Sequence, residues 1–433
     1  MRLGQKLSEI RSGFERPFWV ANTSEIFERL SYYAVFSTLA LYLNQTLGFP
    51  MAQAASLSGL FGGAVWVMAI FGGALADRIG FRRALSSAYF ILTCAYFLVG
   101  SIGATWLAPV RAVVPLPLLA GIILFLPALG VALVKPSVVG TTARASKESV
   151  RSIGYSIYYT MVNIGSTLGP FLAGWLHARL PAQDVFLIAA FSVFLMFIVV
   201  LAFYREPRTG GAVPVRSLAQ TGRDFFTVIG NGRFVLFLLI FSGYWIVYWQ
   251  QYLILPIYIS DFVDKNANTP LILITDPLIV ITLTVAINTL TRRIPSFKAL
   301  TLGTLINSVG WLILAAHPSV LTAVLSLAVI ALGEIIQSPR YYEYISRLAP
   351  EGKQGTYLGF AFLPIGIGSL VGGWFGGQLL SRFSGSPQPA KIWLIVTGVG
   401  LVTTLLLFAY DRYVRLSGTE QDTSLAVTQR SNA

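Results

Sequence analysis

Apolar residues recur along the chain in runs of about twenty, separated by short polar stretches, from about residue 17 to about residue 412. A helix needs about 20 predominantly apolar residues to cross the hydrocarbon core of a bilayer. Barrel strands would be shorter and would alternate apolar with polar positions, so helices are the expected spanning structure. The runs predict twelve membrane helices, at roughly 17–44, 52–76, 84–104, 116–142, 152–176, 184–204, 233–260, 271–291, 298–316, 319–346, 355–380 and 391–412.

Composition agrees with an all-α membrane protein. Hydrophobic residues make up 55% of the 433-residue chain and charged residues only 11%, a balance that excludes a soluble domain. The sequence contains no cluster of metal ligands, no phosphate-binding loop and no pairing of a nucleophile with a base. We therefore expect a membrane function that is not enzymatic and needs no cofactor.

The excess positive charge of the chain is concentrated in the loops between the predicted helices. The formal net charge is +13, and basic residues gather in alternate loops, whereas intervening loops such as 44–53 and 315–320 carry little or no charge. The positive-inside rule then predicts that both termini lie in the cytoplasm, with the protein in the plasma membrane, which in a bacterium is the inner membrane. The basic residues thus mark the cytoplasmic loops, so the net positive charge does not indicate a nucleic-acid partner. We expect the chain to be surrounded by lipid.

The helices divide into two sets of six around a polar stretch. We predict an N-terminal bundle at 1–204, a cytoplasmic linker at 205–232, a C-terminal bundle at 233–412 and a flexible cytoplasmic tail at 413–433. The loop ALADRIGFRRAL after the second helix aligns without gaps to TLTRRIPSFKAL after the eighth helix. Such repeated halves commonly rock against each other around a central site.

Three charges lie inside the first apolar segment, at Glu25, Glu28 and Arg29. Each charge at bilayer depth costs roughly 3 kcal/mol, and their spacing places them on one helix face. Lys135, deep in the fourth segment, adds a second cation. Two acids balanced by two bases can exist in a bundle core, and protonation of one glutamate would unbalance them. This predicts a proton switch, and a static structural network is the alternative.

The loop GGALADRIGFRR resembles the signature of the major facilitator superfamily between its second and third helices. Its glycine permits close helix approach, and its charged residues can form a cytoplasmic network that holds one state closed. The charged residues of this expected gate are Asp77, Arg78, Arg82 and Arg83. The alternative is that the loop only marks topology.

Further motifs resemble those of the proton-dependent oligopeptide transporter family, a branch of that superfamily. They are E-x-x-E-R-L-x-Y-Y from Glu25, K-P at Lys135, Y-Y-x-x-x-N-x-G from Tyr158, and E-x-x-x-S-P from Glu334 followed by Leu348-Ala349-Pro350. The resemblance covers both halves and implies a fold of two six-helix bundles. It implies proton coupling by Glu25, Glu28, Arg29, Lys135 and Glu334. It also implies substrate contacts by Arg29, Tyr32, Tyr33, Trp66, Lys135, Asn163, Asp276 and Glu334.

The chain departs from the family pattern at several of these positions. An arginine and an acid that pair across the outer gate in the family are replaced by Phe36 and Trp249, which predicts an aromatic gate contact. Trp66 stands where the family has a pocket tyrosine, so the pocket has a different shape. The 205–232 stretch leaves no room for the two extra helices of many bacterial members. We therefore expect a divergent, twelve-helix relative.

Asp276 replaces the asparagine that the family usually has at the start of the eighth helix. With Glu334 it could form the negative wall of the site, and two nearby carboxylates without a cation favour protonation of one of them. Alternatively, Asp276 caps the helix, with Pro277 in its first turn.

These features predict a monomeric symporter that imports di- or tripeptides, or similar zwitterions, with protons. A zwitterion needs a positive wall and a negative wall, and the sequence places free cations in one half and acids in the other. A proton-coupled exporter of drugs or other small organic molecules is one alternative. A non-transporting membrane sensor is another, but costly buried charges argue against it.

Overall fold

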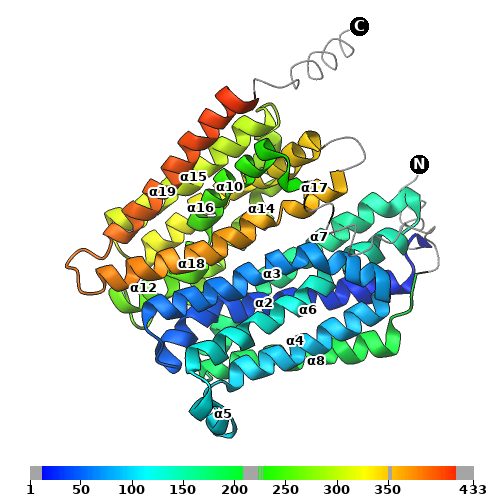
Figure 1. Cartoon of the computed structure of the whole chain (residues 1–433), viewed down its shortest axis with the longest axis horizontal. Coiled ribbons are helices and arrows are strands. Elements are labelled where there is room, and N and C mark those ends of the chain that lie inside the picture. The colour runs from blue at the N-terminus through cyan, green and yellow to red at the C-terminus, as the bar shows by residue number, and fades with distance from the viewer. Residues whose placement is uncertain (1–11, 208–222, 224–225, 227, 350–353, 416–433) are drawn as a thin grey trace.

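The computed structural model describes residues 12–207, 223, 226, 228–349 and 354–415 (Figure 1). This part of the chain is almost entirely helical, and its helices form two bundles that lie side by side. The first bundle contains α2 (Arg16–Leu41), α3 (Met51–Ile79), α4 (Phe81–Ser101), α6 (Leu116–Arg144), α7 (Arg151–His177) and α8 (Ala182–Phe203). The predicted linker and tail lie largely outside the described residues, as does Pro350 of the L-A-P motif.

The second bundle contains α10 (Gly232–Tyr248), α11 (Gln250–Leu253), α12 (Leu255–Phe262), α13 (Thr269–Leu273), α14 (Thr275–Thr291), α15 (Ser296–Ala316), α16 (Val320–Leu348), α17 (Gln354–Phe360), α18 (Leu363–Phe383) and α19 (Lys391–Tyr410). Prolines stand directly before several helices, at Pro50, Pro115, Pro181 and Pro295. Proline fixes φ and has no amide hydrogen, so it suits the start of a helix. Prolines also lie inside α6, α7 and α16, as membrane helices tolerate.

Three predicted helices of the second bundle are interrupted, which corrects the expectation of continuous spans at 233–260, 271–291 and 355–380. The first breaks at Trp249 and Ile254, the second at Ile274, and the third between Phe360 and Leu363. Pro256 and Pro364 lie in the first turn of the segments that follow two of these breaks. Where a helix is interrupted, some backbone groups lose their hydrogen bonds within the helix and can bind a ligand. Interrupted helices of this kind surround the binding sites of many transporters.

Within the described residues, ten helical stretches are long and apolar enough to cross a membrane. The two remaining long helices, α2 and α7, have 26 and 27 residues but contain many polar side chains. Outward-facing apolar side chains such as Phe191, Val285 and Leu405 are 60%, 78% and 67% exposed, which suits contact with lipid rather than water. The protein is an integral membrane protein, and in its described residues the ten apolar stretches join α2 and α7 to make two bundles of six long helical segments.

Glycines bring α3 and α18 together at the boundary between the bundles (Figure 1). A Cβ on Gly59 would lie 2.6 Å from the Ser369 carbonyl oxygen, and one on Gly377 would lie 2.7 Å from that of Ala52. The Ser369 hydroxyl donates to the Gly59 carbonyl oxygen at 3.1 Å. Small residues four apart permit this close approach, as in other membrane helix pairs.

We call the end at which α2 begins and α19 ends the inner end, after its predicted cytoplasmic location, and the opposite end the outer end (Figure 1). The bundles are joined at the outer end. Gln45 Nε2 donates to Ser260 Oγ at 2.6 Å, and Asn268 Nδ2 donates to the Gly174 carbonyl oxygen at 2.8 Å.

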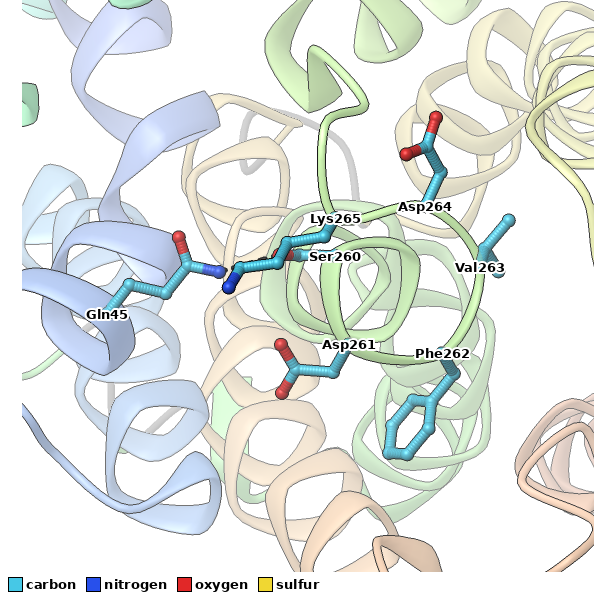
Figure 2. Close-up of a pocket in the computed structure, with 7 residues that line it drawn as sticks. All are labelled: Gln45, Ser260, Asp261, Phe262, Val263, Asp264 and Lys265. Atoms are coloured by element: carbon cyan, nitrogen blue, oxygen red, sulfur yellow. Dashed lines mark hydrogen bonds between the residues drawn. The ribbon is translucent and has the colours of Figure 1, made fainter.

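An open depression of about 510 Å³ lies beside the first of these bonds. Figure 2 shows that Gln45 approaches it from the first bundle, while the other lining residues come from the single segment 260–265 of the second bundle. None of the predicted site residues lines it, so this depression is separate from the candidate site.

Candidate functional site

Arg29 of α2 binds both glutamates of its helix, one more closely than the other. Its Nη2 donates to Glu28 Oε1 at 2.6 Å, and its Nε donates to the second oxygen of the same carboxylate. The same Nε lies 3.6 Å from Glu25 Oε1. All three side chains are buried, with exposures of 0% for the glutamates and 2% for Arg29. A two-point pair of this kind is the strong form of an arginine–carboxylate contact.

Glu25 is therefore the less compensated acid of this cluster. Both of its carboxylate oxygens are buried and neither has a hydrogen-bond partner. The geometry therefore distinguishes Glu25, whose carboxylate has no hydrogen bond, from Glu28, which Arg29 binds at two points.

Lys135 lies near enough to Glu25 and Glu28 to interact with them electrostatically, but it makes no direct ion pair with either. Its Nζ lies 3.7 Å from the centre of the Trp66 ring and 5.7 Å from that of Phe362, and it forms no ion pair with any described residue. The two rings stabilise the ammonium by cation–π attraction. Its hydrogens remain available for a ligand that carries an anion.

A layer of aromatic rings closes the site toward the outer end. Phe36 of α2 stacks on Tyr252 with ring centres 4.9 Å apart and lies 5.5 Å from Trp249. Trp249 Nε1 donates to the Ile365 carbonyl oxygen at 3.0 Å, and all three rings are buried. Phe36 and Trp249 therefore make the predicted aromatic contact between the bundles.

Residues on the inner side of this layer are only partly buried, among them Tyr33, Lys135, Asn163 and Glu334. Tyr159, one turn before Asn163 on α7, is 57% exposed. The aromatic layer is therefore buried, whereas the polar residues on its inner side are partly exposed.

Asp276 and Glu334 meet at one tyrosine in the second bundle. The Tyr248 hydroxyl lies 3.0 Å from Asp276 Oδ2 and 3.0 Å from Glu334 Oε2, and Gln251 Nε2 donates to Asp276 Oδ2 at 3.4 Å. Asp276 is 2% exposed and makes no cap bond at the start of α14, where the N-cap residue is Ile274. The helix-cap interpretation is therefore wrong, and Asp276 instead shares the Tyr248 hydroxyl with Glu334.

Tyr248 and Gln251 were not predicted as site residues, although they lie directly before Trp249 and two positions after it. The signal was present, since both are polar groups in the apolar run YWIVYWQQYL. The α10–α11 break at Trp249 places them beside α14 and α16, and that break has no proline to announce it.

The two other predicted pocket residues of the first bundle have local roles. Tyr32 is buried, stacks on Phe61 with ring centres 5.3 Å apart, and lies 5.0 Å below the Arg29 guanidinium. Asn163 Nδ2 donates to the Tyr159 carbonyl oxygen of its own helix at 2.8 Å. A ligand would have to compete with that bond to engage the Asn163 amide.

Gly165 allows α7 to approach the charged cluster. A Cβ at this position would lie 2.6 Å from both Arg29 Cβ and the Ile26 carbonyl oxygen. We expect Gly165→Ala to push α7 away and to lower the free energy of unfolding by about 1–3 kcal/mol. Gly398→Ala is the matched control, because a Cβ there has nothing within 4 Å. Equal unfolding of both variants in detergent would contradict the expectation.

The expected gate at the inner end has a different pairing from the one predicted. Asp77 Oδ1 lies 3.1 Å from Arg144 Nη2 of α6, not beside the arginines of its own loop. The Arg82 amide donates to Glu206 Oε1 at 2.8 Å, and its Nη2 donates to the Leu201 carbonyl oxygen at 2.9 Å. Arg78 and Arg83 are exposed and have no ion pair among the described residues.

The sequence resembles known membrane proteins over most of its length. The family model described as Major Facilitator Superfamily matches residues 23–363. Multidrug resistance protein MdtH of Salmonella typhimurium is 23% identical over 390 residues, covering 89% of this chain and 92% of the relative. MdtH of Salmonella newport matches to the same extent.

Two solved structures share the fold. A POT family transporter in complex with 5-aminolevulinic acid superposes with a TM-score of 0.76, 18% sequence identity and coverage of 93% of this chain and 98% of that chain. A mutant of the peptide transporter POT in complex with alafosfalin gives a TM-score of 0.74 at 19% identity, covering 90% of this chain and 93% of that chain. At these identities, the likeness concerns the fold.

Proposed function

We propose, from the premise that the chain belongs to the major facilitator superfamily, that this membrane transporter imports short peptides or peptide-like zwitterions together with protons. The observation that carries the proposal is the separation of charge across the site. Lys135, which has no ion pair among the described residues, offers an ammonium on one wall, and Asp276 and Glu334 offer carboxylates on the other. The solved structures of similar fold include complexes with 5-aminolevulinic acid and with a peptide conjugate, which supports a zwitterionic ligand.

The proton acts through charge balance in the first bundle. With both glutamates ionised, Glu25 and Glu28 cancel the charges of Arg29 and Lys135. Protonation of Glu25 leaves one net positive charge, which favours entry of a substrate carboxylate beside Lys135. Loss of the proton on the inner side restores neutrality and releases the carboxylate. Rocking of the two bundles around this site would complete alternating access.

A zwitterion between two charged walls should need both of its termini. We expect N-acetyl-dialanine and dialanine amide each to bind at least about tenfold more weakly than dialanine, a loss of about 1.4 kcal/mol or more. Binding can be measured by calorimetry on the protein in detergent, with alanine amide as a control that carries only the ammonium. Equal binding of the blocked and free dipeptides would contradict the two-wall proposal.

Proton-coupled export of drugs or other small organic molecules is the second candidate. Aromatic residues surround the site, with Phe36, Trp249 and Tyr252 on its outer side and Trp66 beside Lys135. The MdtH relatives also carry the name of a multidrug resistance protein. Binding measurements separate the candidates, since an export site should bind aromatic organic cations and not dialanine, whereas a peptide site should bind dialanine and keep it when such cations are added.

We also propose that the protein is a monomer in the bacterial inner membrane, with both termini in the cytoplasm. The alternating basic loops support this orientation. Protease digestion of a C-terminal epitope in right-side-out and inverted vesicles tests it.

A further inference from the structure

The connection between α4 and α6 is much longer than its counterpart in the second bundle. It covers 102–115 and contains two short helices, η2 (Thr105–Leu107) and α5 (Ala108–Val113), whereas 317–319 alone join α15 to α16. The loops that precede α4 and α15 align in sequence, so the two connections occupy equivalent places in the two halves. Figure 1 shows α5 projecting beyond the outer end of the first bundle. The longer connection is therefore an addition to the repeated unit.

Apolar side chains of this connection are directed away from the protein. Trp106, Val110 and Val113 are all exposed, and Val113 is 83% exposed. Neighbouring apolar side chains that are this exposed mark a surface that contacts something other than water. The 263–268 connection at the same outer end instead exposes charged and amide side chains, as a connection in water does. The two connections therefore differ in the surroundings for which they are suited.

The single charged side chain of the connection is bound to the backbone. Arg111 is the only charged residue between 102 and 118. Its Nη1 donates to the Ile102 carbonyl oxygen at 3.1 Å, and its Nη2 donates to that of Ala104 at 3.0 Å. Carbonyl groups at the end of a helix lack partners within the helix. Arg111 thus joins α5 to the end of α4, and the outward side of α5 has no charge.

The lipid-facing side of α4 continues directly onto this surface. Phe90 and Phe97 are 55% and 47% exposed, and their spacing places them on one side of α4. The Trp106 ring stacks on Phe97, with ring centres 6.1 Å apart and planes 20° apart. Tryptophan is enriched at the level where a bilayer meets water. The apolar surface of the spanning helix therefore extends through Trp106 to η2 and α5.

We propose that η2 and α5 lie on the outer leaflet of the bilayer, with Trp106, Val110 and Val113 inserted at the boundary between lipid headgroups and acyl chains. Helices with one apolar side bind membranes in this way. At 3.6 residues per turn, Ala108 and Ala112 lie on the opposite side of α5 from Val110 and face water. Because the second bundle has only 317–319 at the equivalent place, this contact holds the outer end of the first bundle alone. The two bundles are then attached unequally to the membrane in which they move.

Spin labelling of the full chain in lipid vesicles tests this placement, since the sequence contains one cysteine, Cys94. In a Cys94→Ala background, a nitroxide is attached at a single introduced cysteine. Its relaxation by oxygen, which concentrates in lipid, is compared with its relaxation by a water-soluble nickel complex present on both sides of the membrane. Lys265→Cys, in the polar connection at the outer end, gives the reference ratio for water. Ile122→Cys, on the exposed side of α6, gives the reference ratio for lipid.

We expect Val110→Cys and Val113→Cys to give oxygen-to-nickel ratios between the two references, and Ala112→Cys to give a ratio close to that of Lys265→Cys. Ratios at Val110→Cys and Val113→Cys equal to the water reference would overturn the proposal, because α5 would then stand in water. Equal ratios at Val110→Cys and Ala112→Cys would also overturn it, since no side of α5 would be directed at lipid.

The same samples distinguish lipid from a second copy of the chain on this surface. Labels at Val113→Cys on separate molecules should show no dipolar broadening when they face lipid. Broadening that disappears on dilution with unlabelled protein would place a second copy against α5 and would overturn the proposal. The measurement needs no substrate, so its result is independent of whether the protein transports peptides.

Discussion

Arg29→Met should abolish transport and lower the free energy of unfolding by about 3–5 kcal/mol, because it leaves the Glu28 carboxylate buried without its cation. Arg29 donates to the Glu28 carboxylate through both Nε and Nη2. The Arg29 side chain is 2% exposed and the Glu28 side chain 0% exposed. The measurement is thermal unfolding of the protein in detergent, together with uptake by reconstituted vesicles. Arg412→Met, which removes an exposed arginine, is the matched control.

A second variant separates charge burial from packing. In Arg29→Met combined with Glu28→Gln, the unpaired carboxylate is gone, so much of the lost stability should return while transport stays absent. Breaking one side of a buried pair costs more than replacing both partners. If Arg29→Met unfolds at the same temperature as the wild type, the Arg29–Glu28 pair does not stabilise the first bundle.

Lys135→Gln and Glu25→Gln should both abolish proton-driven accumulation, but for different reasons. Lys135→Gln removes the ammonium that would receive the substrate carboxylate, so binding should weaken by about 1.5–3 kcal/mol, or roughly 10–150-fold. Glu25→Gln mimics the protonated acid. It should still bind substrate and exchange it between the two sides of the membrane, while accumulation no longer responds to a proton gradient.

Binding, exchange and gradient-driven uptake are therefore measured separately for these variants. Lys391→Gln, which changes an exposed lysine at the start of α19, is the control for the loss of one positive charge. Gradient-driven uptake that survives both Lys135→Gln and Glu25→Gln would contradict the coupling scheme.

The sequence predicted the spanning helices because runs of about twenty apolar residues are a strong and local signal. It also placed Glu25, Glu28 and Arg29 on one face, since helical spacing alone determines this. The superfamily and the fold that the motifs indicated are confirmed by the family match to residues 23–363 and by the solved structures. The interruptions were missed, although Pro256 and Pro364 mark two of them.

The partners of individual charges could not be predicted, because they depend on how distant helices pack. Asp77 lies 67 positions before Arg144, and only the packing of α3 against α6 brings them together. Lys135 faces Trp66 rather than an acid for the same reason. Asp276 could equally have capped its helix, and the α10–α11 break that brings Tyr248 to it has no sequence signature.

Uptake of labelled dialanine into proteoliposomes, with and without an inward proton gradient, tests the central claim most directly. The account predicts accumulation above the external concentration only with the gradient, collapse of that accumulation by a protonophore, and competition by other dipeptides. Absence of accumulation in a sample shown to be folded, with or without the gradient, would contradict peptide symport and leave export of organic molecules as the better account.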